Sequence, residues 1–188
     1  MTQCAEIAEI TDPKLQSRIR ARYIREIAAI QSLGFRHFAF TLETLGPFSA
    51  LSQLLLIPFM LRAKEVLAFP FPLRLGTANV LLTHSEPSSI AFCMGMGVKF
   101  FTNFADGSLL ISSTLTSHTA FQNSTEHQTN SQIVRTPPCL TLQQAWLSHT
   151  TRIQEMEAQG KTVCNIHSLE DYMDISRRED ADLLSRTA

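Results

Sequence analysis

Charge is scarce in the middle of this chain. Only 18% of the 188 residues are charged, against about 25% in an ordinary globular protein. Between positions 79 and 140 the charged residues are Glu86, Lys99, Asp106, Glu126 and Arg135. A stretch with so few charges is either well buried in the protein or covered by a partner.

The chain also lacks a cysteine motif and a leader. Its four cysteines are Cys4, Cys93, Cys139 and Cys164. They are widely spaced and form no CxxC pair, which argues against both a zinc motif and a dense disulfide framework. Residues 1–10 carry two glutamates and no apolar signal-peptide core. We therefore expect a cytoplasmic protein with reduced thiols.

The net charge of −1 gives no sign of a nucleic-acid partner. The charges are nevertheless uneven along the chain. Residues 12–36 carry six basic and two acidic side chains, whereas residues 155–188 carry eight acidic and four basic ones. The simplest interpretation is that the basic first helix and the acidic tail face each other, or that both are solvated.

What the chain does contain is an uncharged run of 18 residues at positions 44–61. This length lies where a buried helix and a membrane-spanning helix are hard to separate. Pro58 interrupts the helix, so the unbroken piece from Pro47 to Ile57 would be about 16 Å long. The bilayer core requires about 30 Å. The preferred interpretation is a core helix, and the alternatives are a helix in a membrane interface and a true span.

Residues 12–34 predict a basic amphipathic helix. Asp12 can cap its start, Pro13 suits its first position and Gly34 suits its end. Apolar residues at spacings of three and four form one stripe, namely Leu15, Ile19, Tyr23, Ile27 and Ile30. The opposite face suits anionic lipid or an acidic partner, although burial of the stripe in the protein's own core is preferred. Residues 35–45 are predicted to be helical too.

Residues 79–135 predict an antiparallel β-meander of about four to five strands. The strongest signal is Asp106-Gly107, because this pair supplies the positive φ angles of a tight hairpin turn. Strands are expected at residues 80–83, 90–94, 98–104, 108–115 and 133–135. The polar residues 116–132 predict a long mobile loop.

Two further helical regions are predicted within residues 141–186. Thr141 and Gln144 form a capping box, and Gly160 suits the end of the helix that they begin. The last segment is interpreted as two short helices, 169–175 and 177–186. The whole chain, residues 1–188, is thus predicted to be a single α+β domain. N-terminal helices precede the central meander, and C-terminal helices pack on one face of its sheet.

No catalytic motif stands out, and the weak candidates for catalysis are His84, Asp106 and His149. His149 lies on the apolar seam of its helix, where a shifted pKa would suit a base or a pH switch; a hydrogen-bonded core histidine is the competing interpretation. Asp106 lies at a hairpin tip, where turn chemistry is the ordinary role. His84 could activate Cys93, but a thiol on an apolar strand is usually inert.

Two other patterns carry less weight. Gly95 and Gly97 are not followed by the helix that a phosphate-binding loop requires. His118 and His127 lie in the polar loop, which favours solvation over metal binding. We expect no cofactor and no metal site.

Three functional hypotheses follow. The first is a non-catalytic binding or regulatory module for an unknown protein or a small apolar ligand, favoured because no polar constellation is clustered in the sequence. The second is a protein held at a membrane by residues 44–61. The third is a small enzyme with scattered site residues. The α+β class hosts many functions and does not choose among them.

Overall fold

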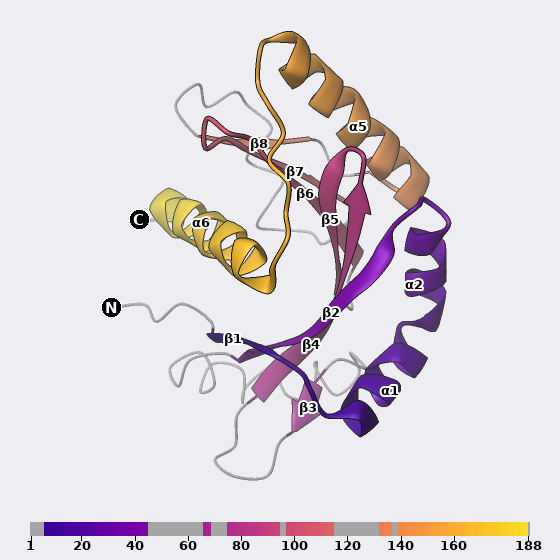
Figure 1. Ribbon diagram of the computed structural model, residues 1–188. Coiled ribbons are helices and arrows are strands. Elements are labelled where there is room, and N and C mark those ends of the chain that lie inside the picture. Colours follow the sequence, from indigo (N-terminus) through magenta and orange to yellow (C-terminus); the bar gives the residue numbers. More distant parts are fainter. Residues whose placement is uncertain are drawn as a thin grey trace.

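A mixed β-sheet forms the centre of the molecule. The computed structural model describes residues 6–44, 66–68, 75–94, 97–114, 132–136 and 139–187. The strands lie in the order β1-β2-β4-β5-β6-β7-β8, and β3 pairs with β4 beside this path (Figure 1). Neighbouring strands are antiparallel except for β7 and β8, which are parallel. The bounds are β1 Glu6–Glu9, β2 Arg36–Thr44, β3 Val66–Ala68, β4 Leu75–Ser85, β5 Ser88–Met94, β6 Gly97–Asn103, β7 Leu109–Ser113 and β8 Ile133–Arg135.

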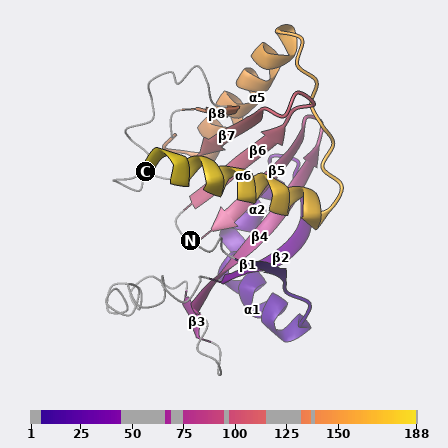
Figure 2. The ribbon, with the colours of Figure 1, turned by 90° about the vertical axis from the view of Figure 1, so that its left-hand side faces the viewer.

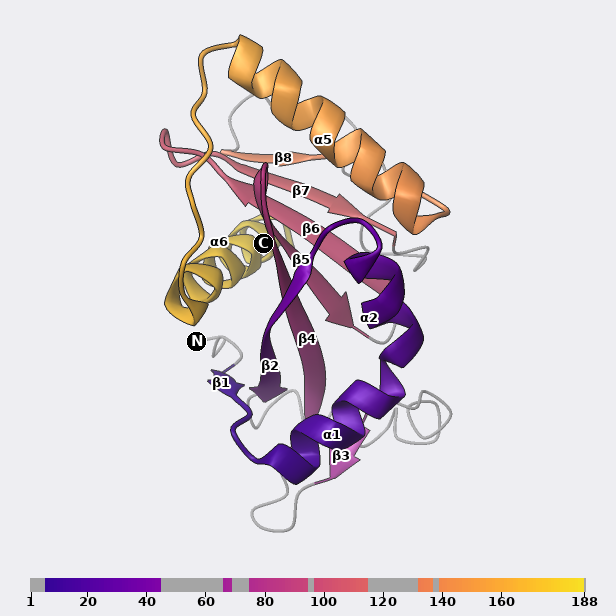
Figure 3. The same ribbon diagram turned by 45° about the vertical axis from the view of Figure 1, so that its right-hand side comes forward.

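Helices cover both faces of this sheet. Their bounds are α1 Pro13–Arg22, α2 Ile24–Gln31, α5 Leu142–Ala158 and α6 Leu169–Thr187. Helices α1, α2 and α5 lie on one face, while α6 lies alone across the other (Figures 2 and 3). Two apolar layers result. The predicted α+β class is confirmed, but the two C-terminal helices lie on opposite faces rather than on one.

The scarcity of charge in the middle of the chain follows from this arrangement. Successive side chains of a strand point to opposite faces, and here each face meets a helix. On β6, Phe100 packs on the side of α1, α2 and α5, whereas Phe101 packs on the side of α6. On β4, Val80, Leu81 and Leu82 are all fully buried. A strand buried on both faces has little room for charge.

Residues 36–44 form strand β2, so the prediction of a helix over residues 35–45 is wrong. Strand β2 lies between β1 and β4 and pairs with β4 from Arg36 to Thr44. A register shift between His37 and Ala39 marks a β-bulge. The bulge interrupts the alternation of β2, since Phe38 and Ala39 pack on one face and Phe40 packs on the other. The long pairing of β2 with β4 decides the structure.

The predicted first helix is two helices with a break at Tyr23. Asp12 caps α1 by accepting a hydrogen bond from the Lys14 amide, as the sequence predicts. The helical hydrogen bonds continue through the break, from Tyr23 N to Ile19 O and from Ile27 N to Tyr23 O. The Tyr23 hydroxyl also donates to the Ala78 carbonyl of β4 at 3.0 Å. This bond ties the junction of the two helices to the sheet.

The C-terminal segment also differs from the prediction, but here one helix replaces two predicted helices. Residues 169–186 were expected to form two short helices, but α6 continues unbroken from Leu169 to Thr187. Helix α5 begins at Leu142 with the Thr141 hydroxyl accepting from the Gln144 amide at 3.2 Å.

The basic α1–α2 pair and the acidic α6 lie on opposite faces of the sheet, so they do not face each other (Figure 1).

The uncharged run and the polar loop lie almost wholly outside the described residues. This applies to residues 45–61 of the run and to residues 116–131 of the loop, with His118 and His127. Within the described part of the chain, no helix has the length and apolar character needed to cross a membrane.

Candidate functional site

His149 is fully enclosed by a network of hydroxyl groups. Its Nε2 and Thr102 Oγ1 share a hydrogen bond of 2.9 Å, and its Nδ1 and Ser112 Oγ share one of 2.8 Å. Ser89 Oγ extends the network to Thr102 Oγ1 at 2.7 Å. Burial lowers the pKa of His149 to about 3. The imidazole is therefore neutral at physiological pH and joins α5 to β6 and β7.

His84 lies half-buried in an aromatic cluster nearby. Its ring centroid is 4.9 Å from that of Phe35 and 5.1 Å from that of Trp146. Trp146 in turn stacks on His149 at 5.7 Å. The His84 Nδ1 atom lies 3.3 Å from the Pro87 carbonyl. Trp146 thus separates the two histidines that the sequence singled out.

Cys93 is not placed to serve His84 as a nucleophile. The thiol is completely buried in the apolar layer beneath α1 and α2. Burial, and secondarily the negative charge of Glu26, raises its pKa to about 12. The thiol is therefore protonated at neutral pH, as expected for an inert core cysteine.

Asp106 lies in the tight turn between β6 and β7. Its Oδ1 accepts hydrogen bonds from the Ser108 amide at 2.9 Å and from the Ser108 hydroxyl at 2.6 Å. Its Oδ2 accepts from Lys161 Nζ at 2.7 Å. These bonds, that from Lys161 first, hold the pKa of Asp106 well below its usual range. An ionised carboxylate so occupied organises the turn and is poorly suited to accept a proton.

The three candidates have separate partners. No hydrogen bond among the described residues joins any two of His84, Asp106 and His149. His84 and His149 share a neighbour in Trp146, while Asp106 belongs to the turn. Among the described side chains there is also no group of three or more His, Cys, Asp or Glu that could hold a metal ion.

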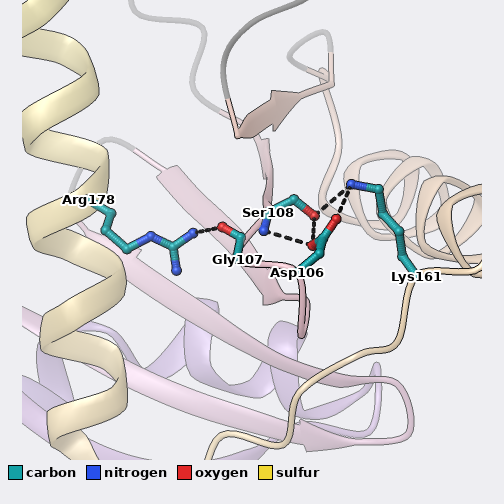
Figure 4. A network of polar contacts seen from close by, with 5 residues as sticks. All are labelled: Asp106, Gly107, Ser108, Lys161 and Arg178. Atoms are coloured by element: carbon teal, nitrogen blue, oxygen red, sulfur yellow. Dashed lines mark hydrogen bonds and ion pairs between the residues drawn. The ribbon is translucent and has the colours of Figure 1, made fainter.

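Two basic side chains from different parts of the chain donate hydrogen bonds to the turn that contains Asp106. Lys161, in the segment between α5 and α6, donates to Asp106 and, at 2.9 Å, to the Ser108 hydroxyl. From the other side, Arg178 of α6 donates to the Gly107 carbonyl (Figure 4). Arg178 also donates through Nη1 to Asn103 Oδ1 at 2.9 Å. One guanidinium thus joins α6 to the end of β6 and to the turn.

A cleft of about 430 Å³ lies beside Arg178. It is bounded by the first turns of α6, the segment leading into that helix and the last residue of β6. The lining residues are Asn103, Asn165, Ile166, Asp171, Asp174, Ile175, Arg177 and Arg178. The two isoleucines supply apolar surface, and the other six residues supply hydrogen-bonding groups. The volume is within the usual range for small-molecule sites, about 300–1,000 Å³.

The carboxylates of this cleft are occupied. Asp171 Oδ2 accepts from the backbone amides of His167 and Ser168 at 2.9 and 2.8 Å, and these bonds, that from His167 first, lower its pKa. Asp174 accepts from Arg177 Nη1 at 2.6 Å. Arg178 differs, because both of its acceptors are neutral oxygens and no ion pair joins it to a described carboxylate. Arg178 is therefore the cation of the cleft that pairs with no described carboxylate, and Asp171 is the carboxylate that pairs with no described cation.

The sequence analysis did not identify this cleft. It treated Arg177 and Arg178 only as part of a net acidic segment. Arg178 and Asn103 are 75 positions apart, so no local spacing brings them together. Comparison with protein families, with curated proteins and with solved structures finds no match for this chain.

Proposed function

We propose that this protein is a non-catalytic binding module whose cleft beside Arg178 takes a small molecule bearing a carboxylate or phosphate group. The observation that carries the proposal is that Arg178, at the wall of a cleft of suitable size, pairs with no described carboxylate.

The geometry of Arg178 supports an anionic ligand. A guanidinium has five N–H donors in a planar fork that matches carboxylate and phosphate oxygens. Contacts to Asn103 and Gly107 use two of these donors and fix the fork in place. The remaining donors can serve a ligand, and a side chain fixed before binding loses less entropy when the ligand arrives.

The ordinary role of such an arginine is to hold the turn. That role accounts for its two hydrogen bonds, but it does not require a positive charge at the cleft. A neutral donor could make the same bonds to neutral oxygens. The charge is what an anionic ligand would use.

The test is titration with inorganic phosphate and with citrate, followed by shifts of backbone amide signals in NMR spectra. We expect binding that Arg178→Gln weakens about tenfold or more. Arg177→Gln is the matched control, because it removes the same charge from the same cleft but from a side chain already paired with Asp174. Thermal unfolding of each variant checks that the fold is retained.

Two results would contradict the proposal. One is the absence of saturable shifts at cleft residues with either probe. The other is equal weakening by the two arginine substitutions, which would indicate a general effect of charge. Arg178→Lys refines the outcome, since it keeps the charge but loses the fork, and it should bind with intermediate affinity.

The proposal includes a cytoplasmic location. Attachment to a membrane through residues 44–61 is the alternative, and it depends on residues outside the described part of the chain. Cell fractionation with carbonate and detergent extraction distinguishes the two. The enzyme hypothesis gains no support from the separate positions of His84, Asp106 and His149, and substitution of each by alanine remains its test.

A further inference from the structure

The outer face of α1 and α2 carries a row of cations. Lys14, Arg18, Arg22 and Arg25 recur at spacings of four, four and three, which places them on one side of a helix. The continuous hydrogen bonds through Tyr23 keep the row aligned across the break. From Lys14 to Arg25 the row is about 16 Å long.

These four cations form no ion pair with a carboxylate among the described residues. None of the ion pairs there involves Lys14, Arg18, Arg22 or Arg25. Lys14, Arg18 and Arg25 are exposed, and the Arg22 guanidinium lies over the Tyr23 ring, 5.8 Å from its centroid. Lys14, Arg18 and Arg25 therefore present positive charge along the outer surface, whereas Arg22 is half-buried and its Nη2 atom is buried without a hydrogen-bond partner among the described residues.

The acidic helix α6 does not balance this row. It lies on the opposite face of the sheet (Figure 3), and three of its carboxylates are already paired within the molecule. Asp174 pairs with Arg177 at 2.6 Å, Glu179 with Lys99 at 2.7 Å and Asp182 with Arg135 at 2.8 Å. The same contacts disfavour a second copy of this chain as the occupant, since α6 has few carboxylates to offer.

Helix α2, which carries Arg25, also has one exposed large apolar side chain. Ile24 is 61% exposed and lies about 100° around the helix axis from Arg25, at the side of the row rather than within it. Protein interfaces combine an apolar centre with surrounding polar groups, and arginine is enriched in them.

A lipid surface fits this face less well. Helices that bind membranes through an apolar face bury it about 5–10 Å into the interface. Here that face is already used, because Ile19, Tyr23, Ile27 and Ile30 are buried against the sheet. Only the charged side is available to a partner.

From these observations we infer that the outer face of α1 and α2 docks an acidic amphipathic helix of a partner protein. Carboxylates of the partner at spacings of three and four face the cation row, and an apolar side chain packs on Ile24. Arginine and carboxylate match in geometry as well as in charge, since the planar guanidinium can hold both carboxylate oxygens.

The test uses a synthetic helical peptide with one row of glutamates and one row of leucines. Its binding to the full chain is measured by fluorescence anisotropy at several salt concentrations. We expect Arg18→Gln with Arg25→Gln to weaken binding about tenfold or more, and added salt to weaken binding to the unaltered chain. Arg152→Gln with Arg177→Gln is the matched control, because it removes two exposed arginines from other helices. It should leave binding within about threefold of the original.

Reversal of charge provides a second variant. Arg18→Glu with Arg25→Glu should lose the glutamate peptide and gain affinity for a version with lysines in the same row. Thermal unfolding and circular dichroism verify that each variant is folded. Failure of this exchange in a folded variant would overturn the inference.

Two other probes separate the alternative partners. Vesicles containing phosphatidylserine and a short DNA duplex are titrated under the same conditions. Tighter binding to either one than to the peptide, lost with the same two arginines, would overturn the helix partner in favour of a lipid or a nucleic acid. No peptide binding, or equal loss in the control variant, would also overturn it.

Discussion

His149 is surrounded by hydroxyl groups rather than by charges. Thr102 and Ser112 each bond to one nitrogen of its ring, so one of them donates and the other accepts when the imidazole is neutral. A protonated imidazole would have two donors in a site that excludes water. The surroundings therefore stabilise the neutral ring, which is why burial holds its pKa at about 3.

This arrangement predicts a loss of stability in mild acid. The unfolded chain binds a proton at His149 near pH 6.5, while the folded chain does not until about pH 3. The contribution of neutral His149 is therefore complete above pH 6.5 and declines as the pH falls toward 3. The slope is up to about 1.4 kcal/mol per pH unit. Urea unfolding between pH 7 and pH 5 measures it with little contribution from carboxylates.

The variants for this experiment are His149→Gln and His167→Gln. The first should flatten the dependence on pH, even if it lowers stability overall. The second is the control, because His167 is exposed and its replacement should leave the slope unchanged. An unaltered slope in His149→Gln would assign the effect to other groups.

At the scale of elements, α6 is held to the sheet by charges as well as by apolar contacts. Tyr172 and Ile175 pack on the sheet, and Lys99 of β6 pairs with Glu179 of α6 at 2.7 Å. The side chains of this pair are only 12% and 7% exposed. Removing one partner of such a pair leaves a charge that is largely cut off from water.

We predict that Lys99→Met lowers the free energy of unfolding by about 3 kcal/mol. The double variant Lys99→Met with Glu179→Met should recover much of this loss, because no charge is then left buried. Arg152→Met, which breaks the exposed pair with Glu155, should cost about 0.5 kcal/mol or less. Urea unfolding of the four proteins checks this. Equal effects of Lys99→Met and Arg152→Met would show that burial of the pair has no consequence.

The elements that sequence analysis predicted are those specified by local signals. The Asp106-Gly107 turn fixes the β6–β7 hairpin, and Asp12 and Thr141 mark the starts of α1 and α5. Strand β2 was missed because its partners, β1 and β4, decide its structure. Strand β1 (Glu6–Glu9) was missed for the same reason, since it is short and pairs with β2 more than 30 positions away.

The cleft could not be predicted for a related reason. Its key contact is the hydrogen bond from Arg178 to Asn103. The neighbouring turn is held by the bond from Lys161 to Asp106, which lies 55 positions away. Such pairs form only after α5 and α6 have taken opposite faces of the sheet. No spacing or composition in a single sequence specifies that choice of face.

At the scale of the whole molecule, the pairing of β2 with β4 permits a test of whether folding needs the uncharged run at residues 44–61. Thr44 of β2 and Gly76 of β4 are register partners in neighbouring antiparallel strands. β2 and β4 therefore lie side by side at the two ends of residues 45–75, a segment that includes β3, which itself pairs with β4. A two-residue Asn-Gly turn can close such a gap.

We predict that a chain with residues 45–75 replaced by Asn-Gly folds with a single cooperative unfolding transition. The register of β2 and β4 is unchanged, so the two apolar layers can still form. Circular dichroism and thermal unfolding provide the measurement, and a Gly/Ser linker of several residues is the control for strain in the turn. An unfolded product from both versions would show that folding needs the removed residues, which include β3 as well as the uncharged run. Fractionation of the folded product beside the full chain then tests membrane attachment.

The pairing of Thr44 with Gly76 also has a consequence for how this protein can vary and be engineered. A segment whose two ends lie in neighbouring paired strands can change in length without displacing those two strands. Insertions between β2 and β3 keep every residue of the described strand pairs, so the pairing of both strands with β4 is retained. The same position is therefore suited to grafting an affinity tag or a reporter domain onto a scaffold that keeps its own hydrogen bonds.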